Sequence, residues 1–271
     1  LGLKDGIKMG SMLKGKSAIV TGATSGIGSA IATSLAEEGC NIIFNGFGDS
    51  EEIEAFRENL CDRHDVDVFY DKCDLTDLAQ ISGMIANAVE RFGRIDILVN
   101  NAGIQHVSPI DEFPTEMFQR IIETNLAAPF YTIRGVLPIM KKNGWGRIVN
   151  ISSVNGYVGS IHKGPYTAAK HGVLGLTKVV ALETAETAIT CNAVCPGFVK
   201  TAIIESQIQT RMKERGLSYA KAEHEHLVDK HPSKKFIPTE DIASVVLYLC
   251  SDTAKHITGI GLPVDGGWLS V

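Results

Sequence analysis

A tyrosine and a lysine lie four residues apart in the segment GPYTAAKHG, residues 164–172. On a helix this spacing places Tyr166 and Lys170 on one face. An isolated tyrosine has a pKa of about 10, so almost none of it is ionised at neutral pH. Because a nearby ammonium favours the phenolate, we predict that Lys170 lowers the Tyr166 pKa and makes the phenol a proton-transfer group. Taken alone, the pair is also typical of a solvated helix face.

Other polar residues extend this candidate site. Ser153 follows the apolar run GRIVNIS, at a position where a strand of an open α/β sheet would end and where such sheets bind ligands. We predict that its hydroxyl holds a substrate oxygen beside the phenol, with Ser152 as the competing candidate. Asn125 lies in a predicted helix, where asparagine is unfavourable. It either kinks that helix or holds water that leads to Lys170.

A glycine-rich turn, TGATSGIG, occupies residues 21–28 between a predicted strand and a predicted helix. Such a turn lets a pyrophosphate approach the backbone and the free N–H groups of the helix. We therefore predict a dinucleotide site. The following loop, residues 45–49, contains no Arg or Lys for the 2′-phosphate of NADP, which favours NAD. Phe47 in this loop either packs on the adenosine or covers the core.

The elements that position these residues alternate along the chain. Short apolar runs rich in Val and Ile predict buried parallel strands at 17–22, 41–46, 95–103, 146–153, 189–197 and 259–267. Apolar residues spaced by three or four predict helices at 29–39, 79–93, 116–144, 166–187 and 239–251. This alternation predicts an α/β fold: a single-domain, Rossmann-type, doubly wound parallel sheet with helices on both faces.

The chain divides into few parts. Residues 1–11 are polar and Gly-rich, and we interpret them as an expression-tag remnant. Residues 12–271 form a single dinucleotide-binding catalytic domain in this interpretation. Within it, the polar and helical stretch 200–238 interrupts the alternation, and we predict that it is a helical lid over the substrate.

Composition narrows the function classes. The 271 residues are 44% hydrophobic and 21% charged with a formal net charge of −5, and no long basic block points to nucleic acid or a membrane. No apolar run approaches the roughly 18 residues of a membrane span. Six scattered cysteines without a CxxC pair predict reduced thiols in a cytoplasmic protein. His224 and His226 form an HxH that we assign to a solvated helix, so we predict no metal.

Several of these motifs occur together in one known family. TGATSGIG, NNAG (100–103), Asn125, Ser153, YTAAK (166–170) and PGFVKT (196–201) resemble the short-chain dehydrogenase/reductase family over residues 12–271. The resemblance implies a homotetramer and a catalytic set of Asn125, Ser153, Tyr166 and Lys170. It also implies cofactor contacts at Gly22, Thr24, Ser25, Gly26, Ile27, Gly28, Phe47, Asp74, Leu75, Asn101, Ala102, Gly103, Tyr166, Lys170, Pro196, Gly197, Val199 and Thr201.

Finer features suggest a substrate class. NGFGD, NNAGIQH, HKGPYTAAKHG, ALETA and VDGGW are similar to the bacterial family members that oxidise (R)-3-hydroxybutyrate to acetoacetate with NAD. This resemblance implies a small hydroxy or oxo acid as substrate, in ketone body metabolism. Its implied substrate contacts are Gln105, Ser153, Asn155, Lys163, Tyr166 and Gln207. Asn155 stands where the family often has His, and Phe198 where it usually has Trp, which bears on affinity and chain length.

Two other functions stay open. An NADPH-dependent 3-oxoacyl thioester reductase of the same family would need a basic grip on the 2′-phosphate, which the sequence does not clearly offer. A non-catalytic dinucleotide-binding sensor would not need the complete set of Asn125, Ser153, Tyr166 and Lys170.

Overall fold

One seven-stranded parallel sheet forms the centre of the protein. The computed structural model describes residues 12–228 and 230–271, so the interpretation of residues 1–11 lies outside the described residues. The strands are β1 (Ser17–Val20), β2 (Asn41–Asn45), β3 (Val68–Asp71), β4 (Ile97–Asn100), β5 (Gly146–Ile151), β6 (Ile189–Pro196) and β7 (Gly261–Val264), in the order β3-β2-β1-β4-β5-β6-β7. The predicted doubly wound parallel sheet is confirmed, and its winding reverses between β1 and β4.

The central strands are buried on both sides because successive side chains point to opposite faces of the sheet. In β1, Ala18 and Val20 belong to one apolar cluster, whereas Ile19 belongs to the other. All side chains of β4, β5 and β6 are buried as well. This explains why these strands read as uninterrupted apolar runs.

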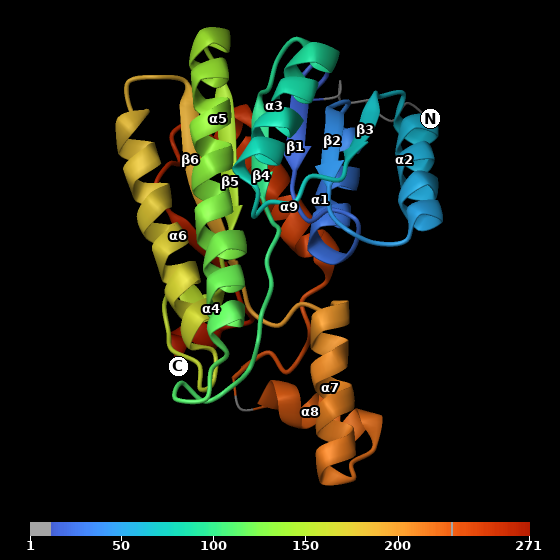
Figure 1. Cartoon of the computed structure of the whole chain (residues 1–271), viewed down its shortest axis with the longest axis vertical. Helices are drawn as coiled ribbons and strands as arrows, with labels where there is room; N and C mark the ends of the chain where they lie inside the picture. The colour runs from blue at the N-terminus through green and yellow to red at the C-terminus, as the bar shows by residue number, and fades with distance from the viewer. Residues whose placement is uncertain (1–11, 229) are drawn as a thin grey trace, which may run out of the picture.

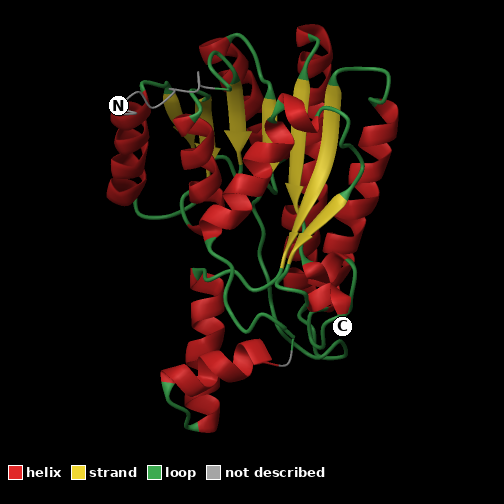
Figure 2. Cartoon of the chain, turned by 180° about the vertical axis from the view of Figure 1, so that it is seen from behind, coloured by secondary structure: helices red, strands yellow, loops and turns green. Residues whose placement is uncertain are grey.

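Helices cover both faces of the sheet (Figure 1). On one face lie α3 (Leu78–Phe92), α4 (Thr115–Ile122), α5 (Ala128–Asn143) and α6 (Gly164–Glu183). Figure 2 shows the other face, where α1 (Gly26–Glu37) and α9 (Thr239–Cys250) pack against each other. Short 3₁₀ turns span Val154–Gly156, Asp252–Ala254 and Trp268–Ser270. The sheet is therefore the middle of three layers.

Two elements were not predicted from the sequence, namely β3 and α2 (Ser50–His64). Helix α2 buries only Ile53 and Leu60 and is otherwise polar, so it shows little apolar periodicity. Strand β3 is the edge strand beside β2, and three of its four residues are only half-buried. Neither element therefore contains a strong apolar pattern.

The predicted helix 116–144 contains a π-turn. A π-helix, Glu123–Ala127, separates α4 from α5. Such turns concentrate at functional sites, and this one contains Asn125, which is 1% exposed. The prediction of a helix is thus confirmed over residues 115–143, and its π-turn lies at the residue that the sequence had marked as an unfavourable helix former.

The insertion, residues 200–238, contains α7 (Ala202–Arg215) and α8 (Tyr219–Val228). Figure 1 shows these helices projecting beyond the end of the sheet. Main-chain pairing of Val199 with Ile237 closes the base of the insertion. Across the part of the chain that the structure describes, no helix is both long and apolar enough to cross a bilayer.

Candidate active site

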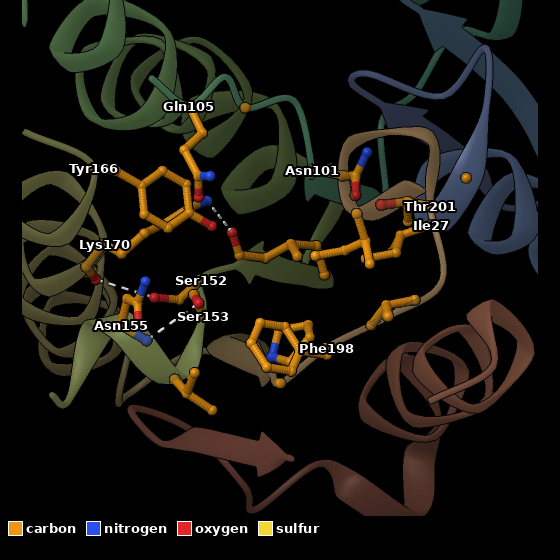
Figure 3. A pocket seen from close by; sticks show the side chains of 18 of the residues that line it. Ile27, Asn101, Gln105, Ser152, Ser153, Asn155, Tyr166, Lys170, Phe198 and Thr201 are labelled. Carbon is orange, nitrogen blue, oxygen red and sulfur yellow. Dashed lines mark hydrogen bonds between the residues drawn. The ribbon is translucent and has the colours of Figure 1, made fainter. Parts of the chain in front are cut away.

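A cavity of about 320 Å³ opens at the carboxyl ends of β1, β4, β5 and β6. Of the residues predicted for the site, it is lined by Gly22, Ser25, Gly26, Ile27, Asn101, Gly103, Gln105, Ser153, Asn155, Lys163, Tyr166, Lys170, Pro196, Gly197, Val199, Thr201 and Gln207. Figure 3 shows Tyr166, Lys170, Ser153 and Asn155 on one side and Ile27, Asn101 and Thr201 on the other. The cavity thus brings together two halves, one with titratable groups and one built on the glycine turn.

Helix α6 places the tyrosine and the lysine one turn apart, as predicted. The helix begins at Gly164, and Pro165 in its first turn fits because that position needs no N–H donor. Lys170 is 4% exposed, and its Nζ donates a hydrogen bond of 2.7 Å to the Ile151 carbonyl. The same Nζ lies 5.6 Å from the centroid of the Tyr166 ring. The ammonium is therefore anchored at the end of β5 beside the phenol.

Burial is the largest influence on the pKa values of Tyr166 and Lys170. Burial raises the pKa of Tyr166; the Ser153 side chain acts against this rise, and the Cys195 thiol adds to it. Burial also lowers the pKa of Lys170 to about 8. The prediction that Lys170 lowers the Tyr166 pKa is therefore wrong for this structure. Desolvation opposes the charged form of each group, and the Lys170 ammonium is engaged by the Ile151 carbonyl.

The two candidate serines differ in what their hydroxyls contact. Ser152 Oγ donates to the Lys170 carbonyl at 3.0 Å, so it ties β5 to α6. Ser153 Oγ accepts a hydrogen bond of 3.1 Å from the Asn155 N–H, which starts the 3₁₀ turn. That contact leaves the Ser153 O–H free to donate into the cavity. The geometry favours Ser153 as the substrate-facing hydroxyl.

Asn125 pairs with the main chain of one neighbour, Ile104. Its Oδ1 accepts from the Ile104 N–H at 2.9 Å, and its Nδ2 donates to the Ile104 carbonyl at 2.9 Å. A Cβ placed on Gly103 would lie 3.5 Å from Asn125 Oδ1 and 3.6 Å from Lys170 Nζ. The side chain therefore fixes the loop after β4 beside Lys170, and one N–H of its Nδ2 and one lone pair of its Oδ1 are not used by these two bonds.

The glycine turn leaves space for a ligand against the backbone. Gly22 and Gly26 have φ values of 61° and 58°, which other residues adopt at a cost. A Cβ on Gly22 would lie 2.6 Å from the Ala102 Cα. Ser25 makes no side-chain cap on α1, and the first turn contains no acidic residue. The N–H groups at this helix end thus suit a phosphate, and these residues fit a dinucleotide.

Some predicted cofactor contacts lie outside the cavity wall, namely Thr24, Gly28, Phe47, Asp74, Leu75 and Ala102. Thr24 Oγ1 donates to the Phe47 carbonyl at 2.8 Å and so joins the glycine turn to the loop after β2. The Phe47 side chain is 68% exposed, which excludes a role in the core. Asp74 Oδ1 accepts from the Thr76 N–H and hydroxyl.

The predicted substrate contacts come from four separate elements. Gln105 follows β4, Asn155 follows β5, Lys163 precedes α6 and Gln207 lies on α7, and all four line the cavity. Burial, with a smaller contribution from Lys230, lowers the Lys163 pKa to about 8. Asn155 is 4% exposed, and its Oδ1 has no hydrogen-bond partner among the described residues. Polar groups for a small acid therefore converge on the Tyr166 end.

Comparison with known proteins identifies the family. The short chain dehydrogenase family matches residues 16–212. The chain belongs to this family. A D-beta-hydroxybutyrate dehydrogenase of Rhizobium meliloti (strain 1021) is 48% identical over 253 residues, covering 93% of this chain and 98% of that protein. A protein of the same name from Cupriavidus necator (strain ATCC 17699) is 44% identical over 259 residues, covering 96% and 100%.

A solved structure supports the fold of this short-chain dehydrogenase. The crystal structure of an actinorhodin polyketide ketoreductase variant with NADPH matches with a TM-score of 0.87 at 36% identity. The match covers 93% of this chain and 97% of that chain. The oxidoreductase class therefore follows, whereas these similarities do not decide between NAD and NADP.

Two residues of this dehydrogenase's cavity region were missed or misjudged from the sequence. Trp268 lines the cavity and lies 4.8 Å from Phe198 between ring centroids. His226, which we assigned to a solvated helix, is 8% exposed and lies 4.3 Å from Phe198 between ring centroids. Only the fold of the insertion brings α8 against Phe198, so the HxH pattern alone could not reveal this contact. His224 is exposed, as expected.

Proposed function

We propose that this short-chain dehydrogenase interconverts (R)-3-hydroxybutyrate and acetoacetate with NAD. The observation that carries the proposal is the position of Lys163, in one cavity with Ser153, Tyr166 and Lys170. Among residues 12–228 and 230–271, Lys163 has no carboxylate partner within salt-bridge distance. A desolvated lysine of this kind favours an anionic ligand. The names of the two bacterial relatives support the same substrate.

In this proposal the residues divide the chemistry between them. Ser153 donates a hydrogen bond to the substrate oxygen, and Tyr166 takes the hydroxyl proton during oxidation or returns it during reduction. Lys170 remains beside Tyr166 as a cation. Lys163, with Gln105 and Gln207, holds the carboxylate and thereby fixes the reacting carbon, which is the positional part of catalysis.

NAD, when bound, supplies the hydride acceptor for oxidation. The glycine turn and the N-terminus of α1 would hold its pyrophosphate. The preference for NAD is supported by the loop 45–49, which offers no basic side chain. Asp49 in this loop caps α2, because its Oδ1 accepts from the N–H groups of Glu51 and Glu52.

Because the pKa of Tyr166 is raised, the proposal predicts how the rates of oxidation and reduction change with pH. A phenol with a raised pKa is protonated at neutral pH and is ready to donate during reduction. Oxidation requires the phenolate, whose fraction grows as the pH increases toward that pKa. We therefore expect oxidation of the hydroxy acid to accelerate with pH and reduction to slow at high pH, measured as kcat/KM in each direction.

A steady-state screen tests the proposed function. The expected result is reduction of NAD by (R)-3-hydroxybutyrate, with much weaker activity for the (S)-enantiomer and for NADP. Activity confined to NADPH and a 3-oxoacyl thioester would support the rival reductase, which is favoured by the NADPH in the similar ketoreductase structure. Cofactor binding without turnover of any hydroxy acid would support the sensor.

We also propose a homotetramer. Large apolar side chains are exposed on the helices of one face, with Phe118 on α4 at 48%, Phe130 on α5 at 47% and Leu182 on α6 at 77%. Exposed apolar groups on adjacent helices suit an interface between copies. Light scattering on a size-exclusion column would test this, and a monomer would contradict it. The cytoplasmic location stays a prediction for cell fractionation.

A further inference from the structure

Four basic side chains converge where the insertion meets the catalytic cavity. Lys163 lies at the start of α6, Arg211 on α7, His226 on α8 and Lys230 just after α8. Lys230 opposes the charge on Lys163, and both oppose the charge on His226 together with Arg211. Lys230 Nζ also lies 5.5 Å from the centroid of the Trp268 ring, and Trp268 lines the cavity. Of the four residues only Lys163 lines the cavity, and Lys230 is exposed, so the cluster extends from the cavity wall to the solvent-facing edge of the insertion.

Three acidic groups near this cluster, among the residues that the structure describes, are engaged elsewhere. On α8, Glu223 pairs with Lys200 at 3.4 Å and Glu225 pairs with Arg215 at 3.2 Å. The Asp265 carboxylate accepts from the main-chain N–H groups of residues 267 and 269. In the described ranges, 12–228 and 230–271, none of the four basic residues makes a salt bridge. At neutral pH the cluster thus consists of three cations around the uncharged imidazole of His226, without a described counter-charge.

His226 is the most deeply buried member of the cluster. Its side chain is 8% exposed, and its Nε2 is buried without a hydrogen-bond partner among the described residues. Burial comes first among the causes, followed by Arg211, Lys163 and Lys230, and together they lower the His226 pKa to about 4. A buried polar atom without a partner is costly, so it points to a group that this structure does not hold. Because the side chains around His226 are positively charged, we expect the group beside its Nε2 to be an anion.

We propose that Lys230 is a second cation for the substrate carboxylate, so that the anion bridges Lys163 on the catalytic side and the Lys230–His226 pair on the insertion. This assignment rests on the proposed function for the identity of the acid. The insertion then contributes to specificity by charge as well as by covering the cavity. His226 acts as a positioning residue, because it packs against Phe198 and holds α8 beside the cavity.

Binding of an unreactive acid tests the assignment without turnover. The probe is butyrate, titrated into NAD-saturated protein and followed by tryptophan fluorescence, with butyramide as the uncharged analogue. Lys230→Gln should weaken butyrate binding about tenfold and leave butyramide binding unchanged. Lys221→Gln is the matched control, since Lys221 is an exposed lysine of α8 outside the cluster. It should leave both affinities unchanged.

Several results would overturn the assignment. One is a butyrate affinity that Lys230→Gln leaves within twofold of wild type. Another is an equal loss for butyrate and butyramide, which would indicate a structural defect. Failure of wild-type protein to bind butyrate would also overturn it. Turnover of (R)-3-hydroxybutyrate by the wild type is measured separately, so a protein that binds butyrate but does not oxidise the hydroxy acid refutes only the proposed function.

Discussion

The affinity of the protein for a carboxylate should decrease as the pH rises past the lowered pKa of Lys163. The structure gives this ammonium a pKa of about 8, because burial and Lys230 oppose its charge. An ordinary lysine would stay charged up to pH of about 10. Only the charged form attracts the acid, so the sign is fixed: binding is strongest below pH of about 8 and is lost as the pH rises above it.

The magnitude follows from the charged fraction. With a pKa of about 8, about 90% of Lys163 is charged at pH 7 and about 10% at pH 9. The dissociation constant of butyrate should therefore increase about tenfold between these two pH values. For an ordinary lysine the same interval would leave the dissociation constant almost unchanged. The pH dependence of the dissociation constant therefore distinguishes a lysine with a lowered pKa from an ordinary lysine.

The assay is butyrate binding to NAD-saturated protein from pH 6 to pH 10, with butyramide as the uncharged control. Lys163→Met should bind butyrate weakly and should flatten the pH dependence. Lys170 also has a pKa of about 8, so any pH dependence of butyrate binding that remains in Lys163→Met measures the contribution of Lys170. A wild-type curve that stays flat to pH 9.5, or a variant that keeps the full dependence, would refute the reasoning.

Four further substitutions test the scaffold and the two serines. Gly22→Ala should weaken NAD binding at least tenfold by calorimetry, because its Cβ would lie 2.6 Å from the Ala102 Cα; unchanged affinity would contradict this. Ser153→Ala should lower kcat about 100-fold, the usual effect of losing one hydrogen-bond donor to the reacting oxygen. Ser152→Ala should mainly lower the melting temperature. If Ser152→Ala instead lowers kcat and Ser153→Ala lowers only the melting temperature, Ser152 is the serine that contacts the substrate. Asn125→Ala should lower the free energy of unfolding by about 2 kcal/mol in urea, since it leaves two main-chain groups unpaired, whereas a loss below ~0.5 kcal/mol would contradict the pairing.

The sequence predicted the fold well where burial leaves a continuous pattern. Strands β1, β4, β5 and β6 are buried along their whole length, so each appears as an apolar run. Helix α2 and strand β3 have mostly half-exposed or polar residues, and no comparable pattern marks them. The π-helix depends on how Asn125 pairs with the Ile104 main chain, which is a tertiary contact.

The chemistry of the site was predicted more accurately than its electrostatics. Residue types and spacing were sufficient to select Ser153, Tyr166 and Lys170, which the fold brings into one cavity. The direction of the Tyr166 pKa was wrong, because spacing reports which charges are near but not how much water is removed from them. The position of His226 depends on the packing of α8 against Phe198, which nothing in the local sequence encodes.

The central claim is that the Tyr166 phenol exchanges a proton with the hydroxyl of a small acid. A single-turnover experiment with Tyr166→Phe tests it most directly: protein loaded with NAD is mixed with (R)-3-hydroxybutyrate, and nicotinamide reduction is followed by absorbance. We predict a rate at least about 100-fold below wild type, the usual contribution of a positioned acid–base group, with NAD and butyrate affinities unchanged. A variant that reduces NAD within about threefold of the wild-type rate, with the same affinities, would contradict the claim.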